Sequence, residues 1–239
     1  VADVAIGRMP IRDGLDFTNM FNKIKTFESG GNWLTNSLFT TGAEVGVFHF
    51  IEESEYQTST VTNINHFKNY LDQIGINLTR TNIVQKLNEG VGLFAYLGEG
   101  NNNSLFGGLQ IVFRDSEIST LLTNKSNPNL MIAMACLVSD ISAPSWNISF
   151  GERMVISSNG SVAVLGAGCQ VWEAESYFIG RRVLTNLYNG QVGRMGDAVL
   201  TSLKEASLYG SVQMVWAVNL LGDPATSIGG PYQTRQAPY

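Results

Sequence analysis

The chain has 239 residues, of which 44% are hydrophobic and 15% are charged, and its formal net charge is −5. This composition predicts a globular protein with a large core, built as one α/β domain or as two small ones. The negative charge and the lack of a basic run argue against nucleic acid as a partner, and no apolar segment is long enough to cross a membrane.

The N-terminal part of the sequence predicts a strand, a helix and further strands. Residues 3–10 suit a short strand that Pro10 ends. Asp13 is a candidate helix cap, and the apolar residues after it recur at helical spacing. Residues 33–41 read as the next strand, and residues 45–51 as an additional one.

The following stretch is rich in polar residues and predicts helices with little sheet. Three glutamates within residues 52–55 form an acidic cluster, which we interpret as a solvated surface. Residues 61–74 predict a helix, and a short strand is expected near Ile76. A further helix over residues 81–88 leads into an apolar run.

Three short apolar runs, separated by helical segments, predict the centre of a parallel sheet. The expected central strands are residues 91–96, 130–135 and 162–165. Helices are expected over residues 173–188 and 193–207. Right-handed crossovers between parallel strands then give a three-layer α/β/α sandwich with a mainly parallel sheet.

Two chemically capable residues follow the first two of these strands. The segment 96–100 reads Tyr-Leu-Gly-Glu-Gly and places Glu99 just after its strand, while Cys136 follows the next. Functional groups in open parallel sheets collect at the carboxyl ends of the strands. Glu99 and Cys136 are therefore expected at one edge of the sheet.

These segments resemble the active-site strands of the gingipain-type cysteine peptidases, a family with a caspase-like fold. That family carries Tyr-x-Gly-His-Gly after one core strand and a nucleophilic Cys after the next. Its Asp-x-x-Ile-Gly-Arg-x-Pro segment matches residues 3–10 here, and its Leu-Gly-Asp-Pro-Ala segment matches residues 221–225. In this chain Glu99 stands where the family has its His, and Leu137-Val138 replaces the usual Gly-aromatic pair after Cys136.

The resemblance implies a domain division and a location. It places residues 1–10 at the end of an N-terminal subdomain that is otherwise mostly absent from this sequence, and residues 11–239 in a caspase-like domain. Because the sequence opens at Val1-Ala2-Asp3 with neither an initiator Met nor a signal peptide, we also expect it to be a fragment or a processed piece of a longer precursor. The family is secreted, which implies an extracellular or cell-surface protein whose partners are proteins or peptides, with self-assembly as one form of partnership.

The substitution at Glu99 predicts weak catalysis or none. A cysteine peptidase needs a thiolate and a group that gives a proton to the leaving amine. An ionised carboxylate disfavours a neighbouring thiolate and has no proton to give. We therefore expect a catalytically impaired domain, a pseudoenzyme, that serves as a secreted structural or binding module, with a place in a larger extracellular assembly as one form of this role. The alternative is an active cysteine endopeptidase with Cys136 as nucleophile. A third hypothesis is an active family member that was inactivated on purpose, and the changes after Cys136 argue against it.

The remaining titratable residues support no cofactor. His49 and His66 are the only histidines; His66 is expected far from the site, and His49 is a weak candidate to replace the missing His. Two histidines and two cysteines show no metal-ligand spacing, and no Gly-rich phosphate loop is present. We expect neither a metal nor a cofactor.

Covalent features are expected at the cysteines and at five sequons. Cys136 and Cys169 each follow a predicted core strand, so they form a disulfide or remain as two free thiols, and the sequence does not decide between the two. A buried, apolar Cys136 is a further reading. The candidate glycosylation sites are Asn77, Asn102, Asn124, Asn147 and Asn159.

Overall fold

A computed structural model describes residues 3–44, 46–142, 147–189, 192–209 and 212–228. Its centre is a six-stranded sheet in the order β2-β1-β3-β7-β8-β9, in which all neighbours are parallel except the antiparallel pair β8 and β9. The strands of this sheet are β1 (Asn36–Thr41), β2 (Asn65–Tyr70), β3 (Leu93–Leu97), β7 (Asn129–Met134), β8 (Ser161–Ala167) and β9 (Val218–Leu221). A small antiparallel sheet contains β4 (Glu99–Asn101), β5 (Ser104–Gly107) and β6 (Gln110–Arg114).

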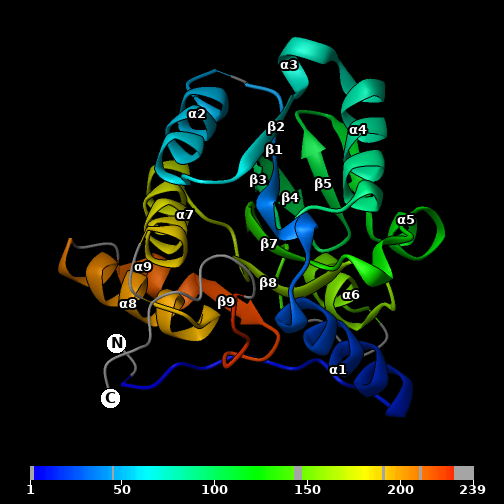
Figure 1. The fold of residues 1–239 in the computed structure, drawn as a ribbon. Helices are drawn as coiled ribbons and strands as arrows, with labels where there is room; N and C mark the ends of the chain where they lie inside the picture. The colour runs from blue at the N-terminus through cyan, green and yellow to red at the C-terminus, as the bar shows by residue number, and fades with distance from the viewer. Residues whose placement is uncertain (1–2, 45, 143–146, 190–191, 210–211, 229–239) are drawn as a thin grey trace.

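Helices cover both faces of the six-stranded sheet, which confirms the predicted three-layer α/β/α arrangement (Figure 1). One face is covered by α1 (Gly14–Ser29), α4 (Ile76–Glu89), α5 (Asp115–Leu121) and α6 (Phe150–Ile156). The other is covered by α2 (Phe50–Thr60), α7 (Glu173–Tyr188), α8 (Met195–Leu208) and α9 (Val212–Ala217). Short helical turns are α3 (Leu71–Ile74), η1 (Asn32–Thr35) and η2 (Asn124–Ser126).

The segment before α1 lies along β9 and adds a short extension to the sheet. The Arg8 amide donates to the Leu220 carbonyl at 2.8 Å, and the Gly222 amide donates to the Arg8 carbonyl at 2.7 Å. A Cβ at Gly7 would lie 2.5 Å from the Gly222 carbonyl oxygen, so only glycine allows this close approach. The motifs at the two ends of the family resemblance, residues 3–10 and 221–225, are thus in direct contact.

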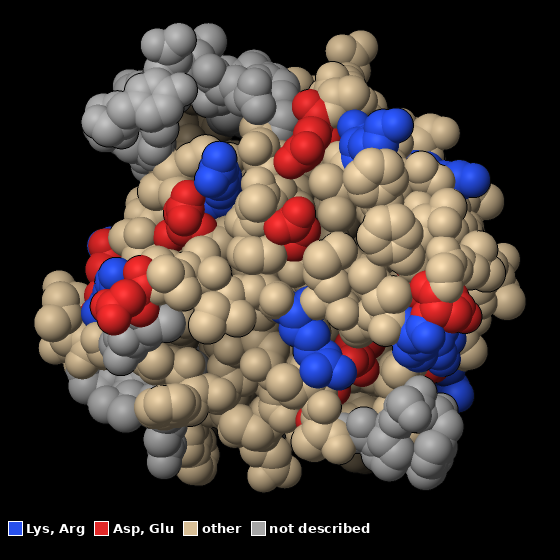
Figure 2. Space-filling model, turned by 90° about the horizontal axis from the view of Figure 1, so that it is seen from below, with Lys and Arg blue, Asp and Glu red and all other residues tan. Residues whose placement is uncertain are grey.

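The surface around this segment and α1 exposes apolar side chains. Seen from below, this side of the molecule is largely uncharged, with acidic and basic residues only scattered over it (Figure 2). The exposed apolar residues of the N-terminal segment and α1 are Val4, Ile6, Met9, Ile11, Leu15, Phe17 and Phe21. Phe17 and Phe21 stack with their ring centroids 5.9 Å apart.

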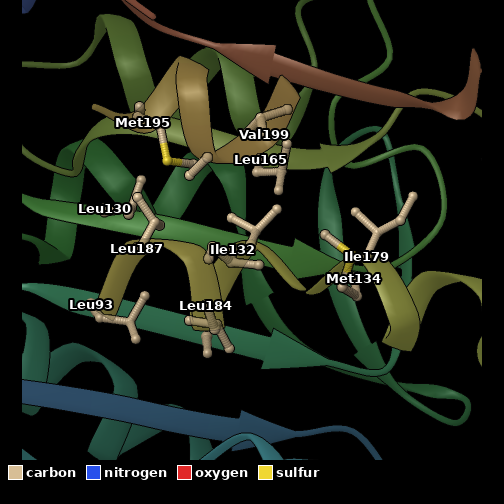
Figure 3. Close-up of a cluster of buried hydrophobic side chains, with 14 of the residues drawn as sticks. Leu93, Leu130, Ile132, Met134, Leu165, Ile179, Leu184, Leu187, Met195 and Val199 are labelled. Atoms are coloured by element: carbon tan, nitrogen blue, oxygen red, sulfur yellow. The ribbon is translucent and has the colours of Figure 1, made fainter. Parts of the chain in front are cut away.

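The core on the α7 face is formed where alternate residues of three parallel strands meet two helices. Leu93, Leu130, Ile132, Met134 and Leu165 point from β3, β7 and β8 toward apolar side chains of α7 and α8 (Figure 3). Strands buried on both faces need apolar residues at every position, which is the pattern that predicted them. The expected strands at residues 91–96, 130–135 and 162–165 are confirmed as β3, β7 and β8.

The predicted strand at residues 45–51 is wrong, because α2 begins at Phe50. Position 45 itself lies outside the described residues. The inward face of α2 has helical spacing but is mostly polar: Phe50, Glu53, Ser54, Gln57 and Thr58. Glu53 is only 2% exposed and accepts hydrogen bonds from the Arg181 guanidinium of α7, so the acidic cluster is not solvated throughout.

The predicted helix over residues 61–74 is also wrong, because its centre is the edge strand β2. An edge strand has a neighbour on one side only and carries exposed polar residues such as Lys68. These residues interrupt the alternation of apolar and polar side chains by which a strand is predicted. The expected strand near Ile76 is instead the first turn of α4. The Asp13 cap is confirmed, since its carboxylate accepts from the amides of Leu15 and Asp16 at 2.9 Å.

His66 on β2 predicts a pH dependence of stability. Its ring nitrogens lie 2.7 Å from the Ser37 hydroxyl and 2.8 Å from the Val61 carbonyl oxygen. Burial lowers the pKa of His66 below 6.5. As the pH falls, the unfolded chain therefore binds a proton at His66 before the folded protein does. The free energy of unfolding should then fall as the pH drops below about 6.5.

This dependence can be measured by urea unfolding between pH 7.5 and 5. His66→Gln should remove part of the slope, whereas His49→Gln, at an exposed residue, should leave it unchanged. Equal slopes in the two variants would contradict the role assigned to His66.

Candidate active site

The strands β3, β7 and β8 run parallel, so their carboxyl ends lie at one edge of the sheet. Glu99 begins β4 directly after β3, and Cys136 follows β7 by two residues. The structure therefore places both predicted residues at the same edge. Glu99 is exposed and Cys136 is half-buried.

The two glycines that flank Glu99 bring its strand against the end of β7. A Cβ at Gly100 would lie 2.9 Å from the Cys136 carbonyl oxygen and 3.0 Å from the Cβ of Ala135. A Cβ at Gly98 would lie 2.6 Å from the Tyr96 hydroxyl. The Gly-x-Gly frame thus fixes the position of residue 99 beside Cys136.

Tyr96 anchors this frame from the buried side. Its hydroxyl donates to the Phe106 carbonyl at 2.5 Å, with the Glu99 carbonyl 3.2 Å away. Burial raises the pKa of Tyr96, so the phenol stays protonated and remains a donor. The tyrosine of the motif therefore holds the β4–β5 hairpin in place.

The sulfur of Cys136 contacts the chain segment that follows β8. The Val171 amide donates to Cys136 Sγ at 3.4 Å, and the Val171 carbonyl oxygen lies 3.8 Å from the same sulfur. Among the described residues, no cationic side chain forms an ion pair or hydrogen bond with this site.

Leu137, which stands where the family sequence pattern has glycine, has a left-handed backbone conformation. Its φ of 61° lies in the left-handed region, which costs a side chain such as leucine roughly 1–2 kcal/mol. Its amide donates to the Cys169 carbonyl at 3.2 Å, which helps to hold this conformation. The turn after Cys136 is therefore one that a glycine would form at a lower cost.

Neither histidine contacts Cys136. His66 pairs through the register Ser37↔His66 with the amino-terminal ends of the strands, opposite the Cys136 edge. His49 lies nearer, because its amide donates to the Glu173 carboxylate at the start of α7 at 2.8 Å. The side chain of Glu99 likewise has no hydrogen bond or ion pair within the described part of the chain.

A cleft of about 390 Å³ opens beside Val171, the residue whose backbone contacts Cys136 Sγ, and sequence reasoning did not find it. Its lining consists of Cys169, Gln170, Val171, Trp172, Glu175, Trp216 and Ala217. Trp172 is 75% exposed and Trp216 is 81% exposed. The signal was available, because residues 169–172 directly follow the carboxyl end of a predicted strand, but Trp216 comes from α9 and only the fold brings it here.

The structure also bears on the expected covalent features. Both cysteines are free, which is the second of the two alternatives drawn from the sequence. Asn124 is buried and its amide group exchanges hydrogen bonds with the Gly160 backbone, so the expectation of a glycan there is wrong. Asn102 donates its amide nitrogen to Asp140, while Asn77 is exposed and Asn147 and Asn159 are partly exposed.

Two further properties concern membranes and metals. No helix in the described ranges combines the length and the apolar character needed to span a bilayer. Within the same ranges, no cluster of three or more His, Cys, Asp or Glu residues could hold a metal ion.

Comparisons with known proteins agree with this geometry. The chain is similar to the Arg-specific cysteine proteinase gingipain R (RgpB), with a TM-score of 0.81, 17% identity, and coverage of 95% of this chain and 57% of that one. The complex of the Porphyromonas gingivalis RgpB pro- and mature domains gives a TM-score of 0.81, 18% identity and the same coverage. The Saccharomyces cerevisiae separase–securin complex gives a TM-score of 0.58 and 14% identity, covering 92% of this chain and 14% of that one.

No curated protein sequence matches the chain. At these identities the structural likeness shows the fold, and the chain spans little more than half of the gingipain R chain. The sequence match to a family is independent of that likeness: the model of peptidase family C25 matches residues 1–229. Because this match covers almost the whole sequence, the chain belongs to peptidase family C25, with the caspase-like α/β fold of the gingipains.

Proposed function

We propose that this domain binds a protein or peptide segment at the carboxyl edge of the sheet and has lost efficient peptide cleavage. The observation that carries the proposal is the exposed carboxylate of Glu99 in the Gly-x-Gly frame beside Cys136. A peptidase of this kind needs a proton donor for the leaving amine, and a carboxylate ionised at neutral pH cannot supply it. The cleft beside Val171 remains open for a bound segment.

The cleft suits peptide recognition for reasons that do not depend on catalysis. Trp172 and Trp216 offer two large apolar surfaces, and Glu175 supplies a negative charge at the same cleft. Exposed tryptophans of this kind account for much of the binding energy in many protein interfaces. These features support recognition of an extended segment with a large apolar or cationic side chain.

The second candidate function is an active cysteine endopeptidase with Cys136 as nucleophile. The amide of Val171, which donates to Cys136 Sγ at 3.4 Å, favours this function because it holds the sulfur against a residue that lines the cleft. In this reading, His49 is the described histidine nearest to the edge through its contact with Glu173. The turnover assay described in the Discussion separates the two functions.

A secreted location and a role in a larger extracellular or cell-surface assembly complete the proposal. The exposed apolar side chains of the N-terminal segment and α1 support an assembly role, because apolar groups of this kind on a surface mark interaction sites. The sequons at Asn77, Asn147 and Asn159 support secretion, since all three remain at least partly exposed. Family membership is consistent with both features.

Peptide binding can be tested with dye-labelled peptide pools and fluorescence anisotropy. We expect the wild-type protein to bind a subset of pools, and Trp172→Ala and Trp216→Ala to weaken that binding roughly 10-fold each. Phe17→Ala is the matched control, because it removes an exposed aromatic ring on α1, away from the cleft. Equal affinities in all three variants, or no binding by the wild-type protein, would contradict the proposal.

A further inference from the structure

The two cysteines lie just past the ends of neighbouring strands. β7 and β8 pair in parallel with the register Ile132↔Leu165 and Ala133↔Gly166. β7 ends at Met134 and β8 at Ala167, so each cysteine lies two residues past the end of its strand. The hydrogen bond from the Leu137 amide to the Cys169 carbonyl at 3.2 Å shows that the two chains stay adjacent there.

The segment after Cys136 stays alongside the end of β8, because the Ser139 amide donates to the Ala167 carbonyl at 2.9 Å. Cys136 Sγ contacts Val171, which packs against the core cluster on the α7 face. Neighbouring strands lie about 4.8 Å apart, and a disulfide needs a Cα separation of about 4.4–6.8 Å.

Contacts of the two sulfur atoms agree with this placement. Cys136 Sγ lies against the backbone of Val171, and Cys169 Sγ lies 3.4 Å from the carbonyl oxygen of Gln170. Both sulfurs therefore contact consecutive residues of one short segment. Cys169 is exposed and Cys136 is half-buried, so an oxidant in solution reaches Cys169 first.

We propose that Cys136 and Cys169 form a reversible disulfide that switches the peptide cleft between two states. The regulatory part rests on the proposed function, because Cys169 and Val171 both line the cleft. The bond removes the Cys136 thiol that faces Val171 and draws the backbone at Cys169 toward β7. Peptide binding is then strong in the reduced state and weak in the oxidised state.

The oxidant in this reaction is a hydroperoxide. The Cys169 thiolate attacks one peroxide oxygen; an S–O bond forms, the O–O bond breaks, and the peroxide is reduced to water or an alcohol. The Cys136 thiolate then attacks the Cys169 sulfur; the S–S bond forms, and hydroxide leaves and takes up a proton to give water. A dithiol reductant reverses the change by thiol–disulfide exchange.

The test counts thiols in the full chain, which does not depend on peptide binding. The protein is treated with hydrogen peroxide, alkylated without reductant and mapped by mass spectrometry. We expect loss of two hydrogens, no alkylated cysteine, a crosslinked pair of peptides containing Cys136 and Cys169, and two labelled thiols again after dithiothreitol. Cys169→Ser should instead oxidise irreversibly at Cys136 or couple between molecules.

Separate outcomes test the disulfide bond and its effect on peptide binding. Two alkylated thiols after oxidation, or sulfinic and sulfonic acids only, would overturn the proposal. If the bond forms, anisotropy with the peptide pools should show at least a roughly 10-fold loss of affinity that dithiothreitol restores. Unchanged peptide affinity after oxidation would overturn the switch. A reduced protein that binds no peptide would refute the proposed function, and the thiol count would still show whether the disulfide forms.

Discussion

We expect the wild-type protein to hydrolyse peptide pools no faster than Cys136→Ala, and Glu99→His to raise hydrolysis by roughly 10²-fold or more. The reason is the frame around residue 99, in which Gly100 allows the strand to lie against the Cys136 carbonyl. An imidazole in this place can exchange a proton near neutral pH, which a carboxylate does not do. The measurement is the release of a fluorophore from quenched peptide pools.

The matched control is Asn103→His, which puts an imidazole on the same hairpin outside the Gly-x-Gly frame. A rise in hydrolysis for Glu99→His alone would assign the missing chemistry to residue 99. Wild-type hydrolysis that disappears in Cys136→Ala would contradict the prediction and favour the active endopeptidase. In that event, loss of activity in His49→Gln would identify the proton donor.

The second large effect is expected at Lys23 in α1, which is 1% exposed. Its ammonium group donates to the carbonyl oxygens of Val155 at 2.7 Å, Ser161 at 2.8 Å and Met154 at 3.0 Å. It therefore caps the last turn of α6 and ties α1 to the start of β8. Burial lowers the pKa of Lys23, whereas these carbonyl acceptors favour its protonated form.

Replacing Lys23 with Met keeps the length of the side chain but leaves these buried carbonyl groups without a donor. Each unsatisfied group costs about 1–3 kcal/mol, so the free energy of unfolding should fall by about 3 kcal/mol or more. Urea unfolding measures this loss. Lys25→Met, at an exposed position of the same helix, should change stability by less than about 0.5 kcal/mol, and equal losses in the two variants would refute the role of Lys23.

The fold could be predicted where burial alone selects the residues. β3, β7 and β8 are covered on both faces, so their sequences are apolar throughout and distinctive. α2 could not be found in this way, because polar residues such as Glu53 and Gln57 face inward: Gln57 donates to Glu53, and Glu53 in turn accepts from Arg181, which is far away in sequence. β2 was misread because an edge strand tolerates polar residues at both faces.

The candidate site could be predicted only in part. The rule that side chains gather at the carboxyl ends of parallel strands was sufficient to bring Glu99 and Cys136 together. The cleft could not be predicted from the sequence, because Trp216 reaches it from α9. The position of α9 depends on how it packs against α7 and α8. The burial of Asn124 was hidden for a similar reason, since its partner Gly160 lies in another loop.

The contact between Arg8 and β9 has a consequence for how copies of this domain could associate. An open edge strand offers its amides and carbonyls to any other chain, and this is a common route to aggregation. The Arg8 segment occupies those groups at Leu220 and Gly222 on one edge, and Lys68 places a charge on the opposite edge, β2. Both borders of the sheet are thus protected against strand exchange and fibre growth, so assembly of this domain should proceed through side-chain surfaces and stay reversible.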